Sequence, residues 1–200
     1  IEDTPSLPKG HEIARQQTIL ASAEPAADPA TSPATLRVDD GTIHVVTDDV
    51  HWSLSTYTGF ISGWDHQGRP LIADALSDCF VRAPIDNDIC SSEVDNPSPD
   101  AWLAAWQKAG LFDLEHHCRS VDVRGNVVVS QHEYTALGGV LICSQWTHRF
   151  DADGAVNIDV EVSKEISDLP LPRVGARLLR CFFPGLVFDL YLRLRRPMGE

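Results

Sequence analysis

Three short polar side chains, Asp86, Asn87 and Asp88, stand where this sequence could most readily carry out chemistry. Pro84 precedes them and is expected to end a strand, so they lie on a loop, where they can bond backbone amides, pair with Arg82 or face a ligand. Two carboxylates two residues apart are common in loops, which argues against an independent acid and base pair. Because Asp and Asn are first of all turn residues, we expect a polar corner braced against Arg82 rather than direct ligand contact.

A second dense group of reactive side chains is the run His116, His117 and Cys118. Histidine and cysteine are common zinc ligands, yet adjacent residues of a strand face opposite sides of a sheet. His116 and Cys118 therefore share one face and His117 lies on the other, which favours a structural role. We expect no metal site in this chain. No GxSxG, GxGxxG or P-loop motif supports a nucleophile elbow or a nucleotide site.

Five cysteines stand at positions 79, 90, 118, 143 and 181. Their number is odd, their spacing is irregular and no CxxC pair occurs, so neither a disulfide framework nor a zinc knuckle is expected. A reducing, cytoplasmic compartment is the simplest interpretation.

Tryptophans form the other candidate ligand-binding surface. Trp102 and Trp106 are four residues apart beside Leu103, a spacing typical of a helix packed on a sheet, so we expect core residues rather than a sugar-stacking platform. A second hypothesis nevertheless stays open, that of a free-standing carbohydrate-binding or interaction module. It would use the five tryptophans as stacking surfaces: Trp52, Trp64, Trp102, Trp106 and Trp146.

The sequence predicts one short helix, near residues 99–109. Ser98 serves as its N-cap, Pro99 occupies the first helical position, and Gly110 closes its end.

Alternating apolar and polar residues predict strands on both sides of this helix. They cover residues 42–47, 50–56 and 60–64 before it, and about 113–123, 126–134, 140–150 and 155–163 after it. Short turn-forming segments join consecutive strands, as in antiparallel meanders. The expected fold is therefore mainly β, an antiparallel β-sandwich with one short helix.

The two ends differ from this central part, residues 36–176. Residues 1–20 contain one loosely alternating strand, and residues 21–35 form a Pro/Ala linker without large apolar side chains. Residues 177–200 form an atypical tail that is basic and apolar together, and the last thirty residues carry six basic and two acidic side chains.

The composition is that of an ordinary globular protein. The 200 residues, of 22.0 kDa, are 43% hydrophobic and 22% charged, with a net charge of −13. Such a charge repels phosphate backbones and anionic lipid surfaces, so nucleic acid is not an expected partner. No run of 18 apolar residues occurs, so no membrane span is expected, and no secretory signal is visible.

The motif RAPxDND at residues 82–88, followed by a helix with the pattern W…W…AG, resembles the C-terminal small-chain domain of the multidomain β-galactosidases of glycoside hydrolase family 2. The resemblance runs from about residue 10 to about residue 175. Residues 1–20 look like the terminal strand of the preceding immunoglobulin-like domain. The fold it implies is a galactose-mutarotase-like supersandwich, truncated here.

The resemblance implies hydrolysis of terminal β-D-galactosides such as lactose by a retaining mechanism, with two glutamates ~5–5.5 Å apart as nucleophile and acid/base. In this family both stand on a central (β/α)₈ barrel of ~250 residues, so no catalytic residue is expected in this chain, which alone should be inactive. By the same resemblance, Arg82, Pro84, Asp86, Asn87 and Asp88 form a motif loop that is structural or adjacent to the active site.

The resemblance also implies the partners of the chain. These are the catalytic barrel domain, in the same polypeptide or a partner chain, and the galactoside substrate. The parent enzyme is expected to be cytoplasmic and homo-oligomeric, and to bind Mg²⁺ and a monovalent cation, neither of which this chain is expected to hold.

Two features depart from the family's pattern. The motif normally continues with glycine, where this chain has Cys90; if the backbone there requires a positive φ, cysteine strains it. After Gly175 the family's alternating strands give way to the basic, apolar tail. A reading-frame shift near Ala176 would produce such a break, and the alternative is a divergent strand followed by an amphipathic tail.

The missing later strands carry a prediction about stability. Each sheet of a sandwich buries its apolar face against the other, so their loss is expected to expose an apolar stripe formed by Val156, Ile158, Val160 and Val162. We expect the isolated chain to be oligomeric or only partly ordered, unless residues 177–194 fold back over this stripe.

Overall fold

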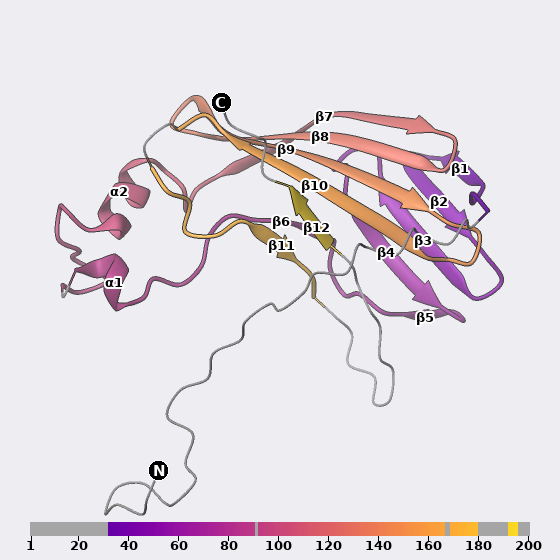
Figure 1. Cartoon of the computed structure of the whole chain (residues 1–200), viewed down its shortest axis with the longest axis horizontal. Helices are drawn as coiled ribbons and strands as arrows, with labels where there is room; N and C mark the ends of the chain where they lie inside the picture. Colours follow the sequence, from indigo (N-terminus) through magenta and orange to yellow (C-terminus); the bar gives the residue numbers. More distant parts are fainter. Residues whose placement is uncertain (1–31, 91, 167–168, 180–191, 196–200) are drawn as a thin grey trace, which may run out of the picture. The chain divides into compact units, whose positions relative to one another are not determined.

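The computed structural model describes residues 32–90, 92–166, 169–179 and 192–195, and it is built mainly of strands (Figure 1). The strands are β1 (Leu36–Asp39), β2 (Thr42–Val46), β3 (Val50–Ser55), β4 (Ile61–His66), β5 (Arg69–Pro70), β6 (Ser77–Cys79), β7 (Glu115–Arg124), β8 (Val127–Ala136), β9 (Gly139–Phe150), β10 (Val156–Lys164), β11 (Gly175–Arg177) and β12 (Leu192–Arg195). The helices are α1 (Asp86–Ile89) and α2 (Trp102–Lys108). The predicted strand in residues 1–20, most of the linker and most of the tail lie outside the described residues.

The first sheet is a meander in the order β1-β2-β3-β4-β5, in which each strand pairs antiparallel with the next. The three strands predicted before the helix are confirmed as β2, β3 and β4. Alternation places Ile43 and Val45 of β2, and Trp52 and Leu54 of β3, on the buried face.

The second sheet has the order β12-β10-β9-β8-β7. Strands β7 to β10 pair antiparallel, and they confirm the four strands predicted after the helix. The short strand β12 runs parallel to β10, opposite Ile158–Glu161. Strands β6 and β11 form a separate antiparallel pair.

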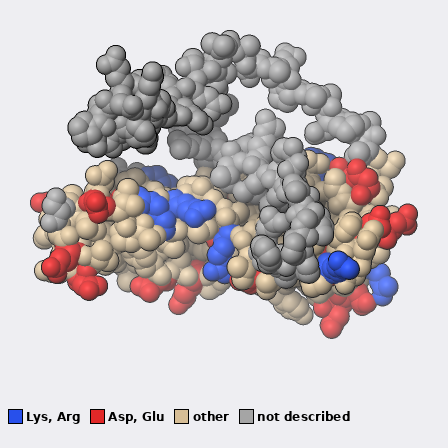
Figure 2. Space-filling model, turned by 90° about the horizontal axis from the view of Figure 1, so that it is seen from below, with Lys and Arg blue, Asp and Glu red and all other residues tan. Residues whose placement is uncertain are grey.

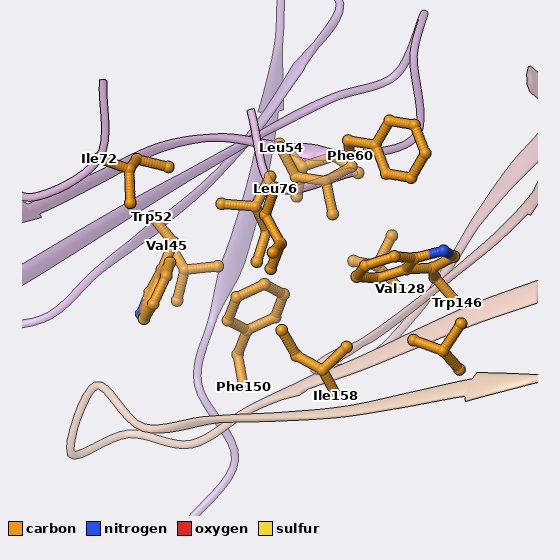
Figure 3. Close-up of a cluster of buried hydrophobic side chains, with 13 residues drawn as sticks. Val45, Trp52, Leu54, Phe60, Ile72, Leu76, Val128, Trp146, Phe150 and Ile158 are labelled. Atoms are coloured by element: carbon orange, nitrogen blue, oxygen red, sulfur yellow. The ribbon is translucent and has the colours of Figure 1, made fainter. Parts of the chain in front are cut away.

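The buried faces of the two large sheets share one apolar cluster, which confirms the predicted sandwich. Figure 3 shows Val45, Trp52 and Leu54 of the first sheet in one group with Trp146, Phe150 and Ile158 of the second. Ile158 and Val160 are only 2% and 1% exposed. The expected exposure of the stripe is therefore wrong for these two residues, because they pack in the cluster between the sheets.

Helix α2 is shorter than predicted. It begins at Trp102 with Ala101 as its extended N-cap, and the Ser98 carbonyl accepts the Ala101 amide at 2.9 Å. Ser98 is therefore not the N-cap, because a turn through Pro99 comes before the helix. The predicted end is confirmed, since Gly110 follows the helix with φ +74.

The helix end is a Schellman motif. The Gly110 amide donates to the Gln107 carbonyl at 3.0 Å, and the Leu111 amide donates to the Trp106 carbonyl at 3.1 Å. Neither described helix is long and apolar enough to cross a membrane.

The two tryptophans of α2 have different surroundings. Trp106 is buried in a second cluster with Leu103, as predicted. Trp102 is 47% exposed, so its assignment to the core is wrong. It is the first helical residue, and it lies outside the cluster that holds Leu103 and Trp106.

Candidate functional site

Arg82 and Asp88 close the motif loop with a two-pronged ion pair. Arg82 Nη1 and Nη2 donate to the Asp88 carboxylate at 2.6 and 3.1 Å, a geometry typical of strong arginine–carboxylate pairs. The Ile85 amide donates to the same carboxylate at 2.8 Å. The hydrogen bonds from Arg82 hold the pKa of Asp88 below its usual range, so this buried side chain is charged at neutral pH.

Arg82 also ties the loop to neighbouring segments. Its Nε donates to the Pro172 carbonyl and its Nη1 to the Ala83 carbonyl, both at 3.0 Å. The guanidinium lies 5.8 Å from the centre of the Trp106 ring, within range of a cation–π contact. Trp106 in turn donates to the Pro170 carbonyl at 2.8 Å. One arginine therefore joins the loop, α2 and the segment that leads to β11.

The middle of the loop presents its side chains to solvent. Pro84 is half-buried, and Ile85, Asp86 and Asn87 are exposed. Asp86 and Asn87 make no side-chain hydrogen bond with any residue that the structure describes. Where the sequence predicts a loop, the structure has the single helical turn α1, because the Asp88 carboxylate accepts an amide at its N-terminus.

Cys90 ends α1 in the left-handed region, with φ 52 and ψ 49. This conformation costs an L-residue ~1–2 kcal/mol, and glycine adopts it freely. The condition under which cysteine strains this position is therefore met. The side chain is exposed and is not in a disulfide.

We call residues 83–110, which contain α1 and α2, the α1–α2 lobe. Its exposed acidic side chains include Asp86, Glu93, Asp95 and Asp100, whereas the first basic residue is Lys108. Acidic side chains lie at this end of the molecule in Figure 2.

Apolar side chains are exposed on the same lobe. Ile85, Val94 and Trp102 are 54%, 51% and 47% exposed. Exposed apolar side chains bordered by charge are typical of an interaction surface.

A second polar cluster, centred on Asp78 of β6, was not found from the sequence. Tyr134 Oη and Ser144 Oγ donate to Asp78 Oδ2 at 2.7 and 2.5 Å, and Trp146 Nε1 donates to Oδ1 at 3.0 Å. Burial raises the pKa of Asp78, and the three hydrogen bonds oppose this rise. The signal that could have revealed the cluster is the row of polar and aromatic residues at inward-facing positions of β8 and β9.

Histidines continue this polar row. His116 Nε2 lies 2.9 Å from His132 Nδ1, and His132 Nε2 lies 2.8 Å from Ser130 Oγ. Burial lowers the pKa of His132 to about 3 and that of His116 below its ordinary value, so both rings are neutral at pH 7. His117 is exposed on the opposite face, as alternation predicts. The described residues contain no group of three or more side chains able to hold a metal ion.

Most of the tryptophan surfaces of the second hypothesis are not available to a ligand. Trp52, Trp106 and Trp146 are buried. Trp64 is half-buried and stacks on Trp52 with ring centres 4.6 Å apart. Trp102 alone among the five is exposed.

Comparison with known proteins identifies the family. The profile described as "Beta galactosidase small chain" matches residues 46–180, a range that includes the motif loop and the Asp78 cluster. A β-galactosidase of Aeromonas hydrophila is 39% identical over 180 residues, which cover 88% of this chain and 17% of that protein. β-Galactosidases of Vibrio vulnificus and Oenococcus oeni are 36% and 32% identical, over 89% and 92% of this chain and 18% of each relative. The chain thus spans less than a fifth of these relatives and belongs to the β-galactosidase small chain family.

Proposed function

We propose that this chain is the small-chain part of a β-galactosidase that hydrolyses terminal β-D-galactosides such as lactose. In this proposal the chain supplies a structural sandwich beside a catalytic barrel that lies outside it. The observation that carries the proposal is the family match, together with the three β-galactosidases reported above, of which this chain spans only 17% to 18%.

Catalysis is assigned to residues outside the chain. A retaining mechanism needs two carboxylates ~5–5.5 Å apart, and the ends of barrel strands can present such a pair. Asp88 is held by Arg82, and Asp78 is held by three donors from β8 and β9. Their engagement in separate clusters supports structural roles for both.

The α1–α2 lobe is the surface that we assign to the barrel. Its exposed Ile85, Val94 and Trp102 offer an apolar contact, and its acidic side chains suit a partner surface bordered by Lys and Arg. The brace between Arg82 and Asp88 fixes the loop before contact, which lowers the entropy cost of association. Asp86 and Asn87 are then the motif residues that reach the interface.

The same proposal includes the location, assembly, metal ions and domain order of the parent enzyme. The parent enzyme is cytoplasmic and homo-oligomeric and binds Mg²⁺ and a monovalent cation through residues outside this chain. Residues 1–20 end an immunoglobulin-like domain, residues 21–35 are the linker, residues 36–176 form the small-chain domain, and residues 177–200 are the atypical tail.

A graft tests the proposed role. Residues 36–176 replace the matching segment of the Aeromonas hydrophila β-galactosidase, and turnover of a chromogenic galactoside is measured. We expect the chimera to be active and Asp86→Ala with Asn87→Ala to lower its kcat/KM. The control Asp122→Ala, at an exposed acidic residue of β7, should leave kcat/KM unchanged.

The isolated chain provides the complementary measurement. We expect the 200 residues alone to show no turnover of the same galactoside. Turnover by the chain alone would contradict the assignment of catalysis outside it, and a folded but inactive chimera would contradict the proposed structural role.

A further inference from the structure

A pocket of about 440 Å³ opens where β6, β7 and β8 meet the segment after α2. The rings of Phe60, Phe80, Phe112 and Tyr134 line it. Its volume lies within the ~300–1,000 Å³ range of small-molecule sites, which combine apolar and aromatic walls with a few fixed polar groups. The proposed contact with the barrel does not use this pocket.

The polar groups of the pocket are held in place by hydrogen bonds to their neighbours. Asp78 lines the pocket and is fixed by its three donors, one of which is the Tyr134 hydroxyl. His116 also lines the pocket, and its Nε2 is engaged with His132. Its Nδ1 makes no hydrogen bond with a described residue and is left for a ligand. A neutral imidazole can donate from one nitrogen and accept at the other, so His116 suits a hydroxyl group.

The charges at the rim neutralise each other. Arg177 Nη2 and Asp74 Oδ2, which both belong to lining residues, form an ion pair at 3.0 Å. Because the charged side chains at the rim form an ion pair, the pocket favours a neutral ligand. Its aromatic walls and oriented polar groups favour a ligand with one apolar face and several hydroxyl groups. A pyranose has both, since its C–H face packs on aromatic rings and its hydroxyl groups exchange hydrogen bonds with carboxylate and imidazole.

We propose that this pocket binds a neutral hexose such as galactose, with Phe112 as the stacking ring and with Asp78 and His116 as hydrogen-bonding groups. Phe112 is 40% exposed, whereas Phe60 and Phe80 are 4% and 3% exposed. Phe112 is therefore the ring that a ligand can still cover. This inference does not rest on the proposed function, because it concerns binding by this chain itself.

Trp146 provides an intrinsic signal for the test. Its indole donates to Asp78, so a ligand that contacts the carboxylate changes the surroundings of the indole. The 200-residue chain is titrated with galactose while tryptophan fluorescence is recorded, and glycerol at equal mass concentration serves as the control solute. We expect a saturable change with galactose at millimolar concentrations and none with glycerol.

Matched variants assign the signal to the pocket. Phe112→Ala should weaken galactose binding by at least about fivefold, since it removes the stacking ring. Val123→Ala is the control, because Val123 is 41% exposed on β7 and does not line the pocket, and it should leave the affinity unchanged. Near-ultraviolet circular dichroism establishes that each protein is folded, and Phe112→Leu replaces the alanine variant if that variant unfolds.

Three outcomes would overturn the proposal. They are a folded wild-type chain that shows no saturable response to galactose, an equal response to glycerol, and equal affinities in the wild type and the Phe112 variant. The first of these favours an apolar side chain of the longer polypeptide as the occupant. Activity of the chimera described above is a separate readout, so failure here is distinguishable from failure of the proposed function.

Discussion

Cys90 is one of four described non-glycine residues whose backbone has a positive φ. Its φ of 52 lies where an L-residue is crowded and glycine is not. Cys90→Gly should raise the free energy of unfolding by up to about 1 kcal/mol, because relief of ~1–2 kcal/mol of crowding is partly offset by the greater entropy of glycine in the unfolded chain. Urea unfolding measures the change. Cys90→Ala keeps the Cβ atom and should give no gain, and an equal gain in both variants would assign the effect to the thiol instead.

Buried histidines should make the fold sensitive to acid. Burial lowers the pKa of His132 to about 3 and that of His148 to about 4, the latter partly offset by the nearby Val128 backbone. Both titrate near ~6.5 in an unfolded chain, so below that pH the unfolded chain binds more protons. The free energy of unfolding should therefore fall as the pH falls from ~6.5 toward ~4, by up to about 1.4 kcal/mol per pH unit for each histidine. Asp78, whose pKa is raised by burial, acts in the opposite direction.

Urea midpoints between neutral and acidic pH test this dependence. Both ring nitrogens of His148 are buried without a hydrogen bond of ordinary geometry to a described residue, and the ring has a polar contact with the Val128 backbone, so His148→Leu removes a titrating group and loses that contact. The pH dependence should become flatter in His148→Leu and stay unchanged in His117→Leu, at an exposed position. An unchanged slope in His148→Leu would contradict the assignment to this histidine.

Strand β6 is joined to the second sheet through the side chain of Asp78. It has only three residues, and Asp78 joins it to β8 and β9 through three hydrogen bonds. Asp78→Asn places an amide group among these donors and should cost ~1–3 kcal/mol of stability, the range for an unsatisfied buried polar group. Hydrogen exchange should become faster in β6 and β11 while the pairing of β8 with β9 stays protected. The control is Asp122→Asn on β7, and equal exchange in both variants would contradict a local role for Asp78.

Helix α2 and the long strands show what local sequence determines. Strands β7 to β10 follow from alternation, because more buried positions alternate with more exposed ones over most of each strand, although β7 has no fully buried residue. The end of α2 follows from Gly110, since few other residues adopt φ +74 without strain. The start of α2 and the turn α1 depend on hydrogen bonds that residue types alone do not specify, and they were assigned wrongly.

In the candidate site, too, one contact can be predicted from the sequence and another cannot. Arg82 and Asp88 are six residues apart and carry opposite charges, so their contact is accessible to sequence reasoning. The donors to Asp78 lie 56 to 68 residues away in the chain, so they meet it only once β6 lies against the second sheet. The polar and aromatic residues at inward-facing positions of β8 and β9 are visible in the sequence, but nothing local identifies Asp78 as their partner.

At the scale of the whole molecule, the shared cluster between the two sheets should keep unfolding cooperative without the tail. The described members of this cluster and its packed neighbours end at Leu178. A chain that ends at residue 179 should therefore unfold in one transition, but β10 would lose its parallel partner along Ile158–Glu161. An unpaired strand edge favours association between chains. We therefore expect light scattering to detect concentration-dependent oligomers of the shortened chain, and fewer oligomers of the full chain. Loss of the single transition would contradict this division between core and edge.

The pairing of Trp52 with Trp64 has an optical consequence. The two residues face each other across β3 and β4, with ring centres 4.6 Å apart and planes inclined by 16°. Indoles this close share their electronic excitation, which splits the absorption band and gives two circular dichroism bands of opposite sign. The pair of bands exists only while β3 lies beside β4, whereas Trp146 belongs to the second sheet. The first sheet therefore carries its own unlabelled spectroscopic reporter, which can be followed separately from the second sheet as the chain refolds.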